Sequence, residues 1–138
     1  MNQLKFKLDP YSVNINLKKR ITTLRGDSAT GKSFIYELLR SYNTLNPDIK
    51  CLCINISNTD KHSLIGKLEN LDNSLIVIDH ANHFLDSVEV EKFIRKDYKR
   101  NNHYLLIGRS LPITSALSEY AEPSIEGNNV SIKYIFEE

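Results

Sequence analysis

A chain of 138 residues with a formal net charge of +1 has the length of one domain with one hydrophobic core. Its 41% hydrophobic and 25% charged residues are typical of globular proteins, and its small charge gives no general attraction to nucleic acids, membranes or acidic partners. No apolar stretch approaches the roughly 20 residues of a membrane span, and the N-terminus lacks a signal-peptide core. We therefore expect a single cytoplasmic domain over residues 1–138 without a membrane span.

The first predicted elements are two strands, over residues 13–17 and 21–25, joined by a polar turn. The second strand leads directly into a glycine-containing loop. Apolar residues at helical spacing then predict a helix from Lys32 until an Asn-Pro pair at 46–47 ends it. Residues 50–56 follow as a strand that is apolar on both faces, which is typical of a parallel sheet covered on both sides.

Two cysteines, Cys51 and Cys53, lie two residues apart in this strand. The spacing differs from the C-x-x-C of redox and zinc sites, and no second ligand pair follows. Residues i and i+2 of a strand face the same side, so we expect both cysteines to be small hydrophobic core residues.

The second half of the chain continues the alternation of strands and helices. A short helix ends near Glu69, and residues 75–79 form a second wholly apolar run closed by an aspartate. Asp86 and Glu89 imitate a capping box that opens an amphipathic helix. The remaining segments are a strand over 104–108, a candidate short helix within 111–121 and a closing strand over 130–136. This pattern predicts an α/β fold: a three-layer sandwich around a mainly parallel sheet, with antiparallel strands at the N-terminus and, as a further option, at the C-terminus.

The loop at residues 26–33 matches G-x-x-x-x-G-K-[ST] without a mismatch. Glycines permit backbone angles and close approaches that a β-carbon would forbid, so successive amides can surround an anion at a helix N-terminus. We expect Lys32 to reach the β- and γ-phosphates of ATP, and the Ser33 hydroxyl to bind Mg²⁺. The expected nucleotide-binding residues are Gly26, Asp27, Ser28, Ala29, Thr30, Gly31, Lys32, Ser33 and the adjacent Phe34.

Asp79 closes the apolar run at 75–78. A strand-end aspartate beside such a loop holds Mg²⁺, usually through the water shell of the ion. Many buried strands end in aspartate for structural reasons, but the glycine loop upstream favours the metal role. We expect ATP and Mg²⁺ as cofactors.

Together these motifs resemble the P-loop NTPase superfamily, in the division with an extra strand between the P-loop strand and the Walker B strand. This division contains the ABC, AAA-like and RecA-like ATPases. The resemblance implies a P-loop NTPase core with strand 104–108 at the centre of the sheet. It also implies a polar residue at the end of this strand, Arg109 or Ser110, that senses the γ-phosphate. The alternative for Arg109 is a solvated loop arginine. The segment from Tyr11 to the loop is similar to ABC-type domains, which implies that Tyr11 stacks on adenine; a surface or core tyrosine is the alternative.

The chain also departs from this family pattern. No LSGGQ-like signature is present, and His80 follows Asp79 where a catalytic glutamate is common. His80 can act as a general base near neutral pH, although a structural histidine is the commoner outcome; Asp60 and Asn82 are other candidates to position water. These features predict a slow or partner-dependent Mg-ATPase. The alternatives are a nucleotide-binding switch without significant hydrolysis and, less favoured because residues 110–126 contain no arginine or lysine, a small P-loop kinase.

A basic stretch lies at the end of the second amphipathic helix. It comprises Arg95, Lys96, Lys99, Arg100 and His103. Such a patch can contact nucleic acid, but basic residues in a last helical turn also complement the helix dipole. The compact chain lacks the helical additions of AAA and ABC domains, so we expect a protein partner or self-association for full activity.

Overall fold

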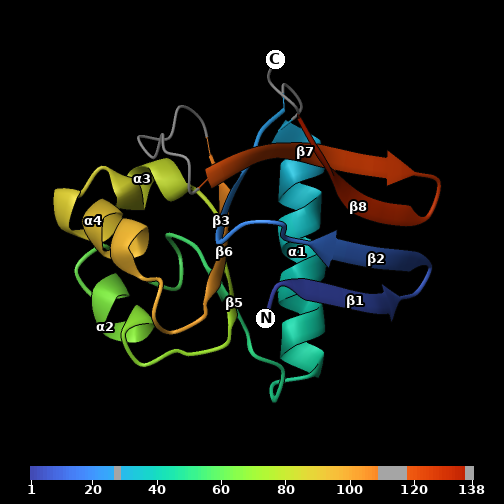
Figure 1. Ribbon diagram of the computed structural model, residues 1–138. Helices are drawn as coiled ribbons and strands as arrows, with labels where there is room; N and C mark the ends of the chain where they lie inside the picture. Colours follow the sequence, from blue (N-terminus) through green and yellow to red (C-terminus); the bar gives the residue numbers. More distant parts are fainter. Residues whose placement is uncertain (27–28, 109–117, 136–138) are drawn as a thin grey trace.

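A computed structural model describes residues 1–26, 29–108 and 118–135 of the chain (Figure 1). Its eight described strands form one sheet in the order β1-β2-β8-β7-β3-β6-β5-β4. The strands are β1 (Gln3–Leu8), β2 (Tyr11–Asn16), β3 (Ile21–Leu24), β4 (Cys51–Ile54), β5 (Leu75–Ile78), β6 (His103–Ile107), β7 (Ser118–Glu126) and β8 (Asn129–Tyr134). The helices are α1 (Ala29–Leu45), α2 (Leu64–Leu68), α3 (Ala81–Leu85) and α4 (Val88–Lys96).

One half of the sheet consists of the parallel strands β3, β6, β5 and β4. Their side chains are buried on both faces, as the unbroken apolar runs predicted. In β5, Leu75 and Val77 belong to the core under α1, whereas Ile76 and Ile78 belong to the core under the other helices. Strand β6 lies between β3 and β5, inside the parallel half and not at the centre of the whole sheet, which is where the resemblance placed residues 104–108. Cys51 and Cys53 are buried, free and in the same core, as expected.

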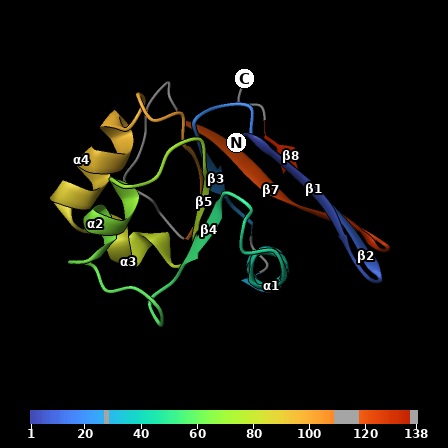
Figure 2. The same cartoon turned by 90° about the horizontal axis from the view of Figure 1, so that it is seen from below.

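The other half of the sheet consists of β1, β2, β8 and residues 121–126 of β7, which pair with β8. This half curls around α1 (Figure 2). Strands β1 and β2 pair antiparallel, and so do β7 and β8, while β2 runs parallel to β8. Alternating apolar residues such as Phe6 and Val13 face α1. The ring of Phe6 stacks on that of Tyr42 in α1, with 3.9 Å between the centroids. The curl therefore encloses α1 from two sides.

The expected three-layer sandwich is wrong. The eight strands form a curled mixed sheet, a half-barrel, with α1 in its concave side, and α2, α3 and α4 flank only the parallel half (Figure 2). No described helix covers the outer face of β1, β2 and β8. The residues on that face, such as Lys5, Asn14 and Asn129, are exposed and polar. This face therefore contacts solvent, whereas a three-layer sandwich would have helices there.

Two further expectations require correction. Residues 13–17 and 21–25 do not pair as neighbouring strands, because β2 lies between β1 and β8, and β3 lies between β7 and β6. The polar residues between them connect two strands that are not neighbours in the sheet. Within this connection, Arg20 donates hydrogen bonds to carbonyl groups at the end of α4, including that of Arg95 at 2.6 Å. Within 111–121, residues 118–121 belong to β7 instead of a helix, and residues 111–117 lie outside the described part.

None of the helices in the described part of the chain has the length and hydrophobicity needed to cross a membrane.

Candidate functional site

The glycine loop connects the end of β3 to the start of α1, and its two glycines are required for different reasons. Gly26 has φ of 152°, a conformation that L side chains rarely adopt. A β-carbon on Gly31 would lie 3.3 Å from Cβ of Pro123, so β7 packs closely against the loop. Of the other expected loop residues, Ala29 and Thr30 form the first turn of α1, and Asp27 and Ser28 lie outside the described residues.

A cavity of about 380 Å³ lies where α1 begins and where β5 and β6 end. It is lined by Lys32, Ser33, Asp79, His80, Asn82, Ile107 and Gly108. The fold thus brings the lysine and serine of the motif together with the aspartate predicted from a distant segment. Lys32 is only 9% exposed, and no hydrogen bond or ion pair joins it to another described residue.

Asp79 is held at the cavity by the local backbone. Val77 faces α1, and the strand period places Asp79 on the same side. Its side chain is 16% exposed, and its Oδ1 accepts a hydrogen bond from the His80 amide at 2.9 Å. The Oδ2 atom lies 3.5 Å from Nδ1 of His80. One carboxylate oxygen therefore remains available to a ligand or a further donor.

His80 adopts a left-handed backbone conformation, with φ of 53° and ψ of 42°. A residue without the freedom of glycine pays about 1–3 kcal/mol for such a conformation, which is found preferentially at functional sites. The turn makes His80 the N-cap of α3, so this helix begins at the rim of the cavity and Asn82 reaches its wall. The half-exposed His80 and Asn82 are thus the two described candidates for contact with water beside Asp79.

The donor set fits Mg²⁺ in combination with a triphosphate. No group of three or more His, Cys, Asp or Glu residues among those described could hold a metal alone. The hydroxyl of Ser33 and the carboxylate of Asp79 are hard oxygen donors on the same cavity. Mg²⁺ typically takes one or two carboxylates and completes its shell with water and substrate phosphates, so these residues match its preference.

Asp60, another predicted catalytic residue, does not line this cavity. The Asp60 carboxylate accepts hydrogen bonds from the amides of Ser63 at 3.0 Å and His62 at 2.7 Å, just before α2. These bonds hold the pKa of Asp60 below its ordinary value. Asp60 therefore stabilises a local turn ahead of α2 and is not among the lining residues. Arg109 and Ser110 lie outside the described residues.

Tyr11, the predicted adenine-stacking residue, lies edge-on against Phe34 of α1, with 5.0 Å between the ring centroids. Both rings are partly buried against the core under α1. This contact is what a core tyrosine would make, and stacking on a base stays a prediction.

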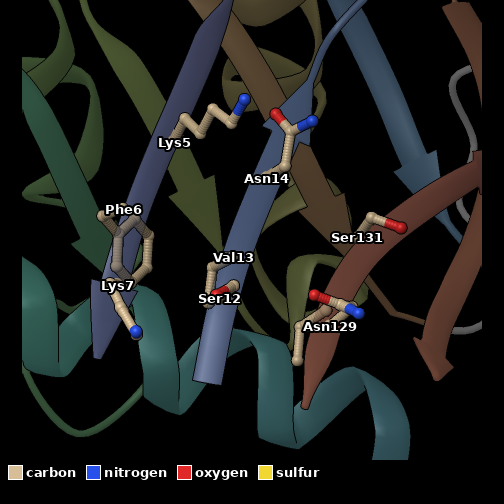
Figure 3. A pocket seen from close by; sticks show the side chains of 9 residues that line it. Lys5, Phe6, Lys7, Ser12, Val13, Asn14, Asn129 and Ser131 are labelled. Carbon is tan, nitrogen blue, oxygen red and sulfur yellow. The ribbon is translucent and has the colours of Figure 1, made fainter. Parts of the chain in front are cut away.

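A second cavity, of about 500 Å³, lies on β1, β2 and β8 (Figure 3). Strand register arranges its polar residues in two rows. One row contains Lys5, Asn14 and Ser131, and the other contains Lys7, Ser12 and Asn129. Neither row contains a carboxylate, and neither lies at a helix N-terminus. This cavity is larger than the first, but it lacks the groups that bind a magnesium triphosphate.

The basic stretch at 95–103 is partly neutralised. Arg95 pairs with Glu91 at 2.9 Å, and Arg100 pairs with Asp97 at 3.0 Å. Burial lowers the pKa of His103, with further contributions from the amino terminus and Arg20. These contacts favour a structural role for the stretch over nucleic-acid binding.

Comparison of the chain with protein-family models, with curated proteins and with solved structures gives no match.

Proposed function

We propose that this chain binds Mg-ATP in the cavity beside residues 26–33. The observation that carries the proposal is the convergence of Lys32, Ser33 and Asp79 on one cavity. They come from α1 and from the end of β5, which the sheet order brings to the same edge. An ammonium, a hydroxyl and a carboxylate at the start of a helix are the groups expected around a metal-bound polyphosphate.

The charge on Lys32 supports an anionic ligand. A cation that is 9% exposed and has no partner among the described residues is stabilised when an anion enters the cavity. The first amides of α1 also direct the positive end of the helix dipole toward this position. Ser33 and Asp79 then provide oxygen atoms for Mg²⁺, which supplies charge neutralisation at the phosphates.

We further propose that hydrolysis by this chain is slow or depends on a partner. In the described lining of the cavity, Asp79 is the only carboxylate, and the groups beside it are His80 and Asn82. An arginine supplied by a partner or by a second copy of the chain can accelerate such a reaction by about 10³–10⁵. A cytoplasmic location, where Mg-ATP is abundant, is part of this proposal. A binding switch without turnover is the second candidate, favoured by the lack of a glutamate after Asp79.

Isothermal titration calorimetry tests the binding proposal. The wild-type chain is titrated with ATP, GTP and tripolyphosphate, each with Mg²⁺ and with EDTA. Saturable ATP binding that strengthens with Mg²⁺ is expected. Absence of ATP binding at millimolar concentration, with folded protein confirmed by circular dichroism, contradicts the proposal.

A turnover assay separates the functional classes. Release of phosphate from ATP indicates an ATPase, and transfer to a small-molecule acceptor indicates a kinase. Binding without either product over hours indicates a switch.

A further inference from the structure

Tyr36 of α1 carries a buried hydroxyl for which the fold alone gives no reason. The residue is 1% exposed, and its hydroxyl has no hydrogen-bond partner among the described residues. Leaving such a group unpaired costs about 1–3 kcal/mol, whereas phenylalanine would fill almost the same volume without this cost. An unpaired buried hydroxyl therefore indicates a partner that arrives with a ligand or an ordered water.

The helix geometry places this hydroxyl close to the cavity. Tyr36 lies four residues after Lys32, so the two side chains share one face of α1. Side chains of an α-helix lean toward its N-terminus, and the long tyrosine ring consequently rises toward the turn of Lys32. Tyr36 belongs to the core layer that also contains Cys53 and Val77. Val77 lies in β5 two residues before Asp79, which follows the strand directly.

The electrostatic environment of Tyr36 includes Asp79. Burial raises the pKa of Tyr36 most strongly, Cys53, Asp79 and Glu37 raise it further, and Arg40 lowers it. The Asp79 charge is therefore one of several that act on the phenol. No direct hydrogen bond joins Tyr36 and Asp79, and among the described residues the Oδ2 atom of Asp79 has the 3.5 Å contact with His80 as its one polar contact.

We propose that Tyr36 is a positioning residue for the magnesium site: in the loaded cavity its hydroxyl donates a hydrogen bond to the Asp79 carboxylate, directly or through one ordered water. This bond and the hydrogen bond from the His80 amide together fix the rotamer of the carboxylate. The inference rests on the proposed binding of Mg-ATP. It concerns the metal-dependent part of the affinity, because Tyr36 is not among the residues that line the phosphate cavity.

The substitution Tyr36→Phe tests this role. ATP affinity is measured by calorimetry with Mg²⁺ and with EDTA, and stability without ligand is measured by urea unfolding. Loss of one hydrogen bond should reduce the enhancement of ATP affinity by Mg²⁺ about five- to tenfold. ATP affinity in EDTA should not change, and stability without ligand should stay equal or rise.

Tyr104→Phe is the matched control. Tyr104 is equally buried, but its hydroxyl already donates to the Asp97 carboxylate at 2.5 Å. This variant should lose stability and keep the wild-type response to Mg²⁺ when it is measured below its melting temperature.

Two results overturn the inference while leaving the proposed function intact: an unchanged magnesium enhancement in Tyr36→Phe, or a loss of stability without ligand like that of Tyr104→Phe. Failure of the wild-type chain to bind ATP in the presence of Mg²⁺ is a different result, and it overturns the proposed function together with the inference.

Discussion

Lys32 is the residue on which phosphate binding should depend most. Replacing it by alanine removes a charge-assisted contact and should weaken ATP binding by about 1.5–3 kcal/mol, as measured by calorimetry. Lys50→Ala is the matched control, because Lys50 pairs with Asp72 on the surface at 2.8 Å and does not line the cavity. Equal ATP affinity of the wild type and Lys32→Ala would contradict the assignment of the phosphate site.

Asp79 should organise the metal and contribute little to the fold. Asp79→Asn retains the Oδ1 atom that accepts the hydrogen bond from the His80 amide. The lost negative charge should therefore reduce the magnesium dependence of ATP binding, while the melting temperature without ligand changes little. Calorimetry with and without Mg²⁺, together with thermal unfolding, checks both parts. A large loss of stability with intact magnesium dependence would show that Asp79 is structural.

His103 should make the fold sensitive to acid. Burial, the amino terminus and Arg20 lower its pKa in the folded chain, so the unfolded chain binds the proton more readily. The contribution to stability is present above the ordinary value of 6.5 and is lost as the pH falls below it. Urea unfolding between about pH 8 and 5 should show this loss, and His103→Gln should flatten it. An identical pH profile in the variant would exclude His103 as the cause.

At the scale of elements, two glycines in helices should respond in opposite ways to substitution by alanine. In α2, a β-carbon on Gly66 meets no atom within 4 Å, so Gly66→Ala should raise stability by about 0.5–1 kcal/mol. In α1, a β-carbon on Gly31 meets Pro123 of β7 at 3.3 Å. A crowding cost of about 1–3 kcal/mol should cancel or exceed the gain in helix propensity there. Denaturant unfolding of both variants checks the pair, and an equal gain at both positions would rule out tight packing of β7 on the loop.

The pattern of apolar residues in the sequence predicted the strands that are buried along their whole length. Strands β4, β5 and β6 are buried on both faces, and their apolar runs are therefore unbroken in the sequence. Strand β1 was missed, although Leu4 and Phe6 alternate with lysines in the manner of a half-exposed strand. Strand β7 has no comparable signal, because Pro123 interrupts it and Glu119, Glu122 and Glu126 do not follow a period of two. Helix α3 depends on the left-handed turn at His80, which the sequence does not show.

The candidate site could be predicted where it depends on one motif and one strand end. Lys32, Ser33 and Asp79 meet in one cavity because α1 and β5 reach the same edge of the sheet. The contact of Pro123 with Gly31 and the unpaired hydroxyl of Tyr36 could not be predicted. Both depend on how side chains from distant segments pack, and no local periodicity records that packing.

At the scale of the whole molecule, the curled sheet depends on pairing between the two ends of the chain. Ser12 and Val13 of β2 pair with Asn129 and Val130 of β8. Pairing over such a separation leaves no mark in a window of neighbouring residues, which is why the sequence predicted a regular sandwich. The same feature leaves the outer face of β1, β2 and β8 to solvent.

The isolated chain should hydrolyse ATP slowly. The described wall of the cavity contains one carboxylate, and an arginine to neutralise the γ-phosphate must come from outside that wall. We expect turnover below about 0.1 s⁻¹, compared with about 10 s⁻¹ for a typical enzyme. Phosphate release, measured over a range of protein concentrations, checks the rate and any acceleration by self-association. Fast turnover that is independent of concentration would show that the monomer already contains a complete catalytic site.

The pairing of β2 with β8 also fixes an order of events during synthesis. Within this chain, the hairpin of β1 and β2 leaves the ribosome before the other described strands, whereas β8, its neighbour in the sheet, follows all of them. At about 5–20 residues per second, the edge of β2 waits for several seconds without its partner strand. A nascent chain stalled before residue 118 lacks both β7 and β8, so its first hairpin has no strand to join. The time between the synthesis of β2 and that of β8 is therefore a period in which this open strand edge is accessible to chaperones and proteases.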